Sequence, residues 1–238
     1  AITIQSLQAQ MPGGSSFSFM GQVTEEEGAP QLNGDVTLKS SNLRSMAEWL
    51  KLDVSHIPSG QLAQFSFQGK VKASPDLLQL YAIEGIMDAM SFKGGVSSAL
   101  QKRPSFGIGL DFKNLNFDSY LGKADDTPLK TEDIKQGLLP LEKFDANYKI
   151  SFSNLTLKGM KVDSGRLEGM LLAGKLDAKT IRLDNLAGVN LLASATGQSF
   201  ATKPEISLSV SANSANLAPL QRMMKWESPL DLGRLGKM

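Results

Sequence analysis

The stretch PSFGIGLDFKNLNF, residues 104–117, decides the fold class, because polar and apolar side chains alternate through it with a period of two. One side carries Phe106, Ile108, Leu110 and Phe112, and the other carries serine, glycine, aspartate and lysine. Such alternation is typical of a half-buried β-strand. The proline at its start suits an initial or edge position of a strand, because proline has no N–H to donate.

The same arrangement occurs three times, each time with an asparagine twelve residues after a proline. PQLNGDVTLKSSNL begins at Pro30 and PEISLSVSANSANL begins at Pro204. A Ser-x-x-Gly pattern precedes each proline, at residues 18–21, 91–94 and 194–197. An aliphatic triplet with spacing two and then three stands further upstream: Ile2, Ile4, Leu7; Leu78, Leu80, Ile83; Ile181, Leu183, Leu186. One supersecondary unit used three times predicts an extended, stacked surface rather than one unique catalytic pocket.

The period changes after each asparagine. Asn42, Asn116 and Asn216 precede segments in which apolar residues recur at helical spacing or nearly so. Asparagine is a strong N-cap residue, because its side chain accepts a hydrogen bond from an unpaired amide at the start of a helix. We therefore expect each unit to contain two strands, a hairpin and a third strand, followed by a short capped helix.

Further alternating segments lie between the units, at residues 63–71, 146–152 and 167–176. The sequence thus predicts a mainly β protein with short helices, in which repeated antiparallel meander units form a twisted, curved sheet. That sheet could be an open groove or a closed sandwich. We expect a first β-rich half at residues 1–121, a linker with a short helix at 122–143, and a second half at 144–238. The short helix is expected over residues 132–139.

Composition excludes several classes of function. The formal charge of +1, from 25 basic and 24 acidic side chains dispersed in ones and twos, argues against a nucleic-acid partner. The chain has no cysteine and one histidine, His56, which we expect to be a solvated turn residue. No apolar run approaches the ~18 to 20 residues of a membrane-spanning helix. Because the chain opens inside a strand pattern, we expect an excised piece whose membrane anchor lies outside it.

No pattern of residues indicates catalysis. Gly107-Ile-Gly109 lacks the third glycine of a dinucleotide-binding loop, and Asp125-Asp126 has no neighbouring histidine or third acid. We expect Trp49 and Trp226 to serve in packing. The sequence therefore predicts no enzyme activity, no catalytic residue, no metal site and no cofactor.

The sequence does supply a large one-sided apolar strand surface, which must be covered. A second sheet, the short helices or an apolar ligand could each cover it. Strand patterning by itself favours a structural domain with a closed hydrophobic core, acting as a spacer or a docking module.

The order of these patterns resembles the periplasmic repeat region of AsmA-like proteins. The resemblance is carried by FDANYKISFSNLTLKGMKV at 144–162, followed in order by Gly-x-Leu, the aliphatic triplet, Ser-x-x-Gly and KPEISLSVSANSANL. SGQLAQFSFQGKVKASPDLLQL, from 59 to 80, is similar to another portion of the same proteins, so that the resemblance covers most of the chain.

The resemblance implies a Gram-negative envelope protein, anchored in the inner membrane and working in the periplasm, that contributes to phospholipid transport and outer-membrane biogenesis. AsmA-like proteins are similar to chorein-type bridge-like lipid-transfer proteins, whose sheet shields acyl chains. Phospholipid acyl chains are therefore the expected partners, and other envelope proteins are a second expected class of partner. The candidate lipid-groove residues are Phe65, Phe67, Phe106, Ile108, Leu110, Phe112, Ile206, Leu208 and Val210.

Overall fold

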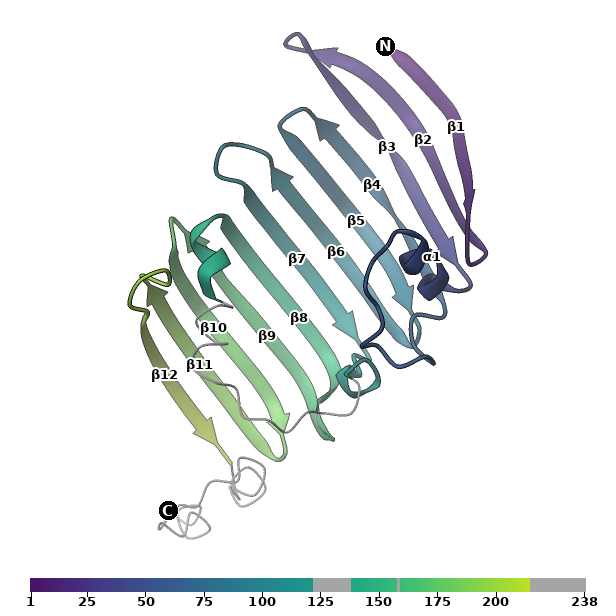
Figure 1. The fold of residues 1–238 in the computed structure, drawn as a ribbon. Helices are drawn as coiled ribbons and strands as arrows, with labels where there is room; N and C mark the ends of the chain where they lie inside the picture. The colour runs from purple at the N-terminus through teal and green to yellow at the C-terminus, as the bar shows by residue number, and fades with distance from the viewer. Residues whose placement is uncertain (122–137, 158, 215–238) are drawn as a thin grey trace.

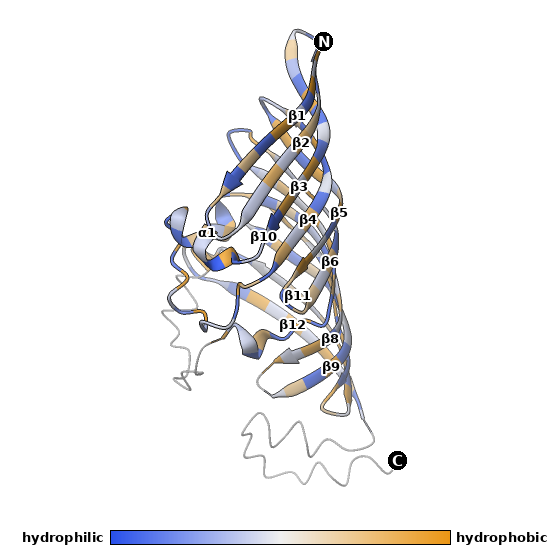
Figure 2. Cartoon of the chain, turned by 90° about the vertical axis from the view of Figure 1, so that its right-hand side faces the viewer, coloured by the Kyte–Doolittle hydropathy of each residue, from blue (hydrophilic) through white to orange (hydrophobic). Residues whose placement is uncertain are grey.

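Twelve strands form one sheet in the computed structural model, which describes residues 1–121, 138–157 and 159–214 (Figure 1). The order of the strands in the sheet is their order in the sequence. The strands are β1 (Ile2–Met11), β2 (Ser15–Glu26), β3 (Ala29–Ser40), β4 (Phe65–Ser74), β5 (Leu77–Met87), β6 (Met90–Ala99), β7 (Ser105–Lys113), β8 (Asp145–Leu157), β9 (Met160–Leu172), β10 (Lys175–Leu186), β11 (Val189–Gln198) and β12 (Glu205–Asn213). The predicted mainly β fold with a twisted, curved sheet is confirmed, and Figure 2 shows the twist.

All neighbouring strands pair antiparallel except β7 and β8, which are parallel. The connection between them therefore leads from one end of the sheet to the other. The 3₁₀ turns η1 (Phe117–Ser119) and η2 (Leu139–Glu142) belong to this connection. The predicted linker at 122–143 falls within this connection, and the helix predicted at 132–139 lies largely outside the described residues. The strands before and after it continue one sheet.

The aliphatic triplets mark β-bulges. The pairing register shifts between Ile4 and Leu7, between Leu80 and Ile83, and between Leu183 and Leu186. A bulge inserts one extra residue into a strand, so a three-residue step keeps both flanking side chains on one face of the sheet. The triplet is thus the sequence signature of a strand bent at a fixed place.

The Ser-x-x-Gly patterns are less regular than the sequence suggests. They fall in β2, β6 and β11, the second strand of each unit, but their glycines occupy different heights. Gly21 lies opposite Ile4, Gly94 opposite Ile83, and Gly197 opposite Leu176, which lies outside the triplet. The pattern therefore lies on the second strand of every unit, but its glycine faces a different member of the aliphatic triplet in the first two units and none in the third.

The asparagine caps differ from unit to unit. Helix α1 (Leu43–Trp49) begins as predicted, with Oδ1 of Asn42 accepting a hydrogen bond of 3.0 Å from the amide of Ser45. Asn116 occupies the corresponding position before η1 but makes no side-chain cap bond. Asn216, like Trp226 and Asp125-Asp126, lies outside the described residues. One capped α-helix therefore follows the predicted pattern within the described part of the chain.

The core consists of small clusters on one side of a single layer. Phe152, Leu155 and Val162 form one cluster, and Ala146, Leu171 and Phe200 form another, with Leu141 of η2 packed against it. Within residues 1–121, 138–157 and 159–214 no second sheet covers the first. The described strands thus do not form the closed sandwich considered as an alternative.

Two predictions about single side chains had different outcomes. His56 is an exposed turn residue, as predicted. Trp49 was expected to pack, and this is wrong, because 56% of its surface is exposed. It sits in the last turn of a seven-residue helix that buries only Met46 and Ala47, so its side chain falls on the outer face.

Candidate functional site: one apolar face of the sheet

All nine predicted groove residues lie on the same face of the sheet. Residues paired across neighbouring strands share a face, and side chains alternate between faces along each strand. Leu38 pairs with Phe67, Phe92 with Phe112, and Phe112 with Phe152, so one face is apolar from β3 to β8. The same reasoning continues to β12 through the pairing of Ala195 with Leu208. We call the side that carries these residues the apolar face.

The apolar face is largely uncovered, to a degree that varies along the sheet. Ile206, Leu208 and Val210 on β12 are exposed by 59%, 64% and 54% of their surface. Phe106 is 36% exposed, and the other five predicted residues are half-buried: Phe65, Phe67, Ile108, Leu110 and Phe112. None of the nine is fully buried. An apolar surface this continuous is unusual on a monomeric soluble protein and marks a site of interaction.

Phenylalanine rings lie over glycines on the apolar face. A Cβ atom added to Gly85 would overlap the ring of Phe92, and one added to Gly165 would overlap the ring of Phe152. The ring of Phe92 also lies 6.3 Å from that of Phe65 and 6.3 Å from that of Phe112. A row of aromatic rings therefore crosses β4 to β8, and Gly85 on β5 lies in the gap between the rings of Phe65 and Phe92.

Sequence reasoning missed Phe92 as a member of this surface, and it left Phe152 out of the candidate groove residues although alternation had put it on the apolar side of its strand. The available signal was the pairing of a phenylalanine with a glycine on a neighbouring strand, Phe92 with Gly85 and Phe152 with Gly165. Such a pairing becomes visible only when the register between strands is known.

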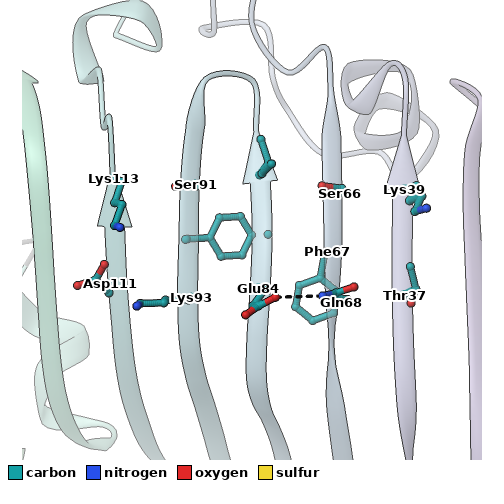
Figure 3. Close-up of a pocket in the computed structure, with 13 residues that line it drawn as sticks. Thr37, Lys39, Ser66, Phe67, Gln68, Glu84, Ser91, Lys93, Asp111 and Lys113 are labelled. Carbon is teal, nitrogen blue, oxygen red and sulfur yellow. Dashed lines mark hydrogen bonds between the residues drawn. The ribbon is translucent and has the colours of Figure 1, made fainter.

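The opposite face, which we call the polar face, carries charged and hydroxyl side chains. A shallow recess of about 440 Å³ lies over β3 to β7, lined among others by Lys39, Lys93, Lys113, Glu84 and Asp111 (Figure 3). The amide of Gln68 donates a hydrogen bond of 3.0 Å to the carboxylate of Glu84 there. The recess mixes both signs of charge, which is typical of a solvated outer surface.

Asp88 joins three segments at the end of the sheet where α1 lies. Its carboxylate accepts hydrogen bonds of 2.9 Å from the amides of Leu62 and Ala63, and of 2.8 Å from the hydroxyl of Tyr120. Burial, and then the hydrogen bond to Asp88, raises the pKa of Tyr120 well above its usual value. This phenol remains a neutral donor, and the contact fixes η1 and the segment after α1 to the turn between β5 and β6.

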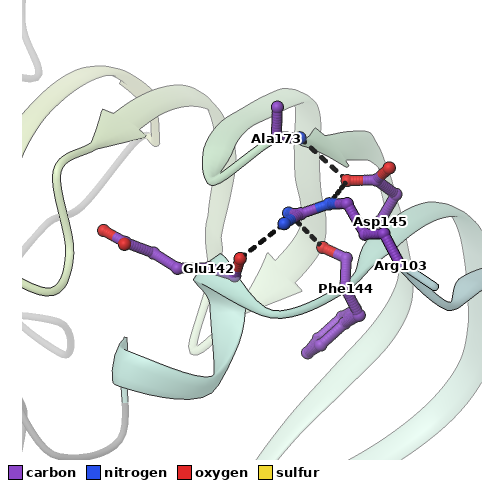
Figure 4. Close-up of polar contacts among 5 residues, drawn as sticks. All are labelled: Arg103, Glu142, Phe144, Asp145 and Ala173. Atoms are coloured by element: carbon purple, nitrogen blue, oxygen red, sulfur yellow. Dashed lines mark hydrogen bonds and ion pairs between the residues drawn. The ribbon is translucent and has the colours of Figure 1, made fainter.

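Arg103 makes a corresponding contact at the opposite end (Figure 4). Its guanidinium donates to the carboxylate of Asp145 at 2.6 Å and to the backbone carbonyls of Glu142 at 2.6 Å and Phe144 at 2.9 Å. The amide of Ala173 donates to the same carboxylate. The Arg103 bond and then the Ala173 bond lower the pKa of Asp145. This contact holds the segment entering β8 against the neighbouring turns.

These polar contacts have structural roles. In the described part of the chain no group of three or more histidine, cysteine, aspartate or glutamate side chains is placed to hold a metal ion. No helix among the described residues is long and apolar enough to cross a membrane. The continuous apolar face is the feature of the described residues that most needs a functional explanation.

Comparison of the chain with protein-family models, with curated proteins and with solved structures found no match. The functional proposal therefore rests on the residues and the geometry described above.

Proposed function

We propose that the apolar face shields phospholipid acyl chains from water, as a non-enzymatic section of a lipid-handling groove. The observation that carries the proposal is the single layer: twelve strands present one continuous apolar face that no second sheet covers within the described residues. An acyl chain with half of its surface against the sheet would gain about 0.4 kcal/mol per methylene, or about 6 kcal/mol for ~15 methylenes.

The division between the two faces supports the same proposal. Head groups need water and acyl chains avoid it, and the sheet separates a charged face from an apolar one by the thickness of one strand layer. Movement along the face would be passive, because the row of rings from Phe65 to Phe152 offers similar contacts at each step. No reactive side chain takes part.

The setting of this function is also a proposal. The resemblance to AsmA-like proteins favours a periplasmic location, within an inner-membrane-anchored Gram-negative protein that contributes to phospholipid transport and outer-membrane biogenesis. Membrane association would then depend on a segment outside this chain.

Lipid extraction and mass spectrometry of the purified chain test the proposal. We expect co-purified phospholipid, and binding of fluorescent phospholipid by the delipidated protein. Ile108→Glu, on the apolar face of β7, should reduce binding at least several-fold. Asn147→Glu is the matched control, because Asn147 is exposed on the polar face of the adjacent strand β8. A lipid-free chain that also ignores added phospholipid would contradict the proposal.

A protein that packs on the same face is the alternative, consistent with a spacer or docking module of the envelope. Both functions need the apolar face, so the loss of binding in Ile108→Glu does not distinguish them. Lipid found on the purified chain without any second protein favours the first function.

A further inference from the structure

The two edges of the sheet are not equally protected. An edge strand exposes unpaired backbone N–H and C=O groups, and proteins usually guard such edges with charges, prolines or bulges. On β1 the register shifts between Ile4 and Leu7, so a bulge interrupts that edge. The ladder between β11 and β12 has nine consecutive pairs with no shift.

The composition of β12 leaves its edge open for pairing. From Ile206 to Asn213 the strand has no charge, no proline and no glycine, and all nine of its residues are exposed. The single charged residue, Glu205, stands at the start of the strand and accepts a hydrogen bond from Gln198 on β11. Among the described residues no strand pairs with the outer side of β12.

From these observations we propose that β12 is an interaction surface for a second copy of this chain, through antiparallel pairing of β12 with β12. The proposal goes beyond lipid binding and does not depend on it. A twofold axis perpendicular to the sheet would relate the two copies, so the contact is closed and each copy offers the same strand.

The sequence of β12 is complementary to itself in this arrangement. When Ser209 lies opposite Ser209 of the second copy, Leu208 lies opposite Val210, and Glu205 lies opposite Asn213. Every pair then joins apolar to apolar on one face and polar to polar on the other, and no like charges meet. Because the axis is perpendicular to the sheet, the apolar faces of the two copies lie on the same side and become continuous.

Pairing of β12 with β1 of another copy is less favourable. Both strands run in the same direction in the sheet, since eleven pairings with one parallel step separate them. Their contact would be parallel, which is slightly less stable per residue, and it would meet the bulge of β1. It would also generate an open polymer rather than a dimer.

Sedimentation equilibrium of the intact chain tests the proposal. We expect wild type to have twice the monomer mass at micromolar concentrations. Leu208→Lys should be a monomer, because a charge on the apolar face of an edge strand blocks pairing. Ile2→Lys is the matched control: Ile2 is 68% exposed on the other edge and Leu208 is 64% exposed. The control should remain dimeric, and circular dichroism should show both variants folded.

A charge-exchange experiment tests the pairing of like strands directly. Ser209→Lys and Ser209→Glu should each be monomeric because like charges would face each other, and an equal mixture of the two should form a dimer. A wild-type chain that is monomeric throughout the micromolar range would overturn the proposal. So would a dimer that survives Leu208→Lys, or a polymer that Ile2→Lys disperses.

Discussion

Gly94 gives a sharp test of the bulged register between β5, β6 and β7. Its φ angle is +142°, a conformation that residues with a side chain rarely adopt, and it lies opposite Ile83 at the bulge and opposite Leu110 on β7. A Cβ atom placed there would overlap the carbonyl oxygen of Gly109 and would lie 3.1 Å from Cα of Leu110. Because the colliding atoms belong to the backbone, no rotamer change relieves the overlap.

The expected cost of Gly94→Ala follows from these two effects. Backbone strain of this kind costs about 1 to 3 kcal/mol, and overpacking costs about 1 to 3 kcal/mol. We therefore expect Gly94→Ala to lower the free energy of unfolding by about 2 to 6 kcal/mol, a large share of the ~5 to 15 kcal/mol typical of a domain.

Gly109→Ala is the matched control, because it changes the neighbouring strand at the same height. Its added Cβ would have nothing nearer than the carbonyl oxygen of Gly95 at 3.9 Å, and its φ is not positive. We expect this variant to be neutral or more stable by up to about 1 kcal/mol, through the reduced entropy of the unfolded chain. Urea unfolding followed by far-ultraviolet circular dichroism measures both variants. Equal urea midpoints for the two would refute the bulged register.

Two further predictions concern the ends of the sheet. Asn42→Ala should cost about 1 kcal/mol of stability through the loss of the bond to Ser45, whereas Asn116→Ala, which removes no side-chain cap bond, should cost much less, as thermal unfolding of the two would reveal. The lowered pKa of Asp145 means that its contacts stabilise the folded chain above the ordinary value of 3.8 and are lost as the pH falls through the lowered value. The urea midpoint of wild type should therefore exceed that of Asp145→Asn at pH 7 and approach it at acidic pH, and a constant difference would contradict the role of the Arg103 contact.

Local structure was predictable from the sequence because its causes are local. Alternation in Phe106 to Phe112 identifies β7 and its apolar side, and Asn42 marks the start of α1. Within each of β4, β7 and β12 the candidate groove residues could be assigned to one side for the same reason, since a side chain's face depends on its position along its own strand.

Features that depend on contacts between strands could not be predicted. The placing of Phe92 over Gly85 requires the register of two strands. The bulge between Leu80 and Ile83 could be found only by interpreting the three-residue step between them as an inserted residue. The parallel pairing of β7 with β8 depends on the connection after Asn116, whose sequence has no clear period. Trp49 was misjudged because a single-layer sheet offers too little core to bury every large side chain.

The one parallel pair in the sheet corrects the orientation of the third repeat. A single strand, β4, separates the first unit (β1 to β3) from the second (β5 to β7), and two strands, β8 and β9, separate the second from the third (β10 to β12). In a wholly antiparallel sheet an even number of intervening strands would turn the third unit upside down. The parallel step removes one of the five reversals that would otherwise separate β5 from β10. The corresponding strands of all three units therefore run in the same direction. With one parallel pair, two intervening strands leave the direction of the next unit unchanged, as a single strand does in an antiparallel sheet.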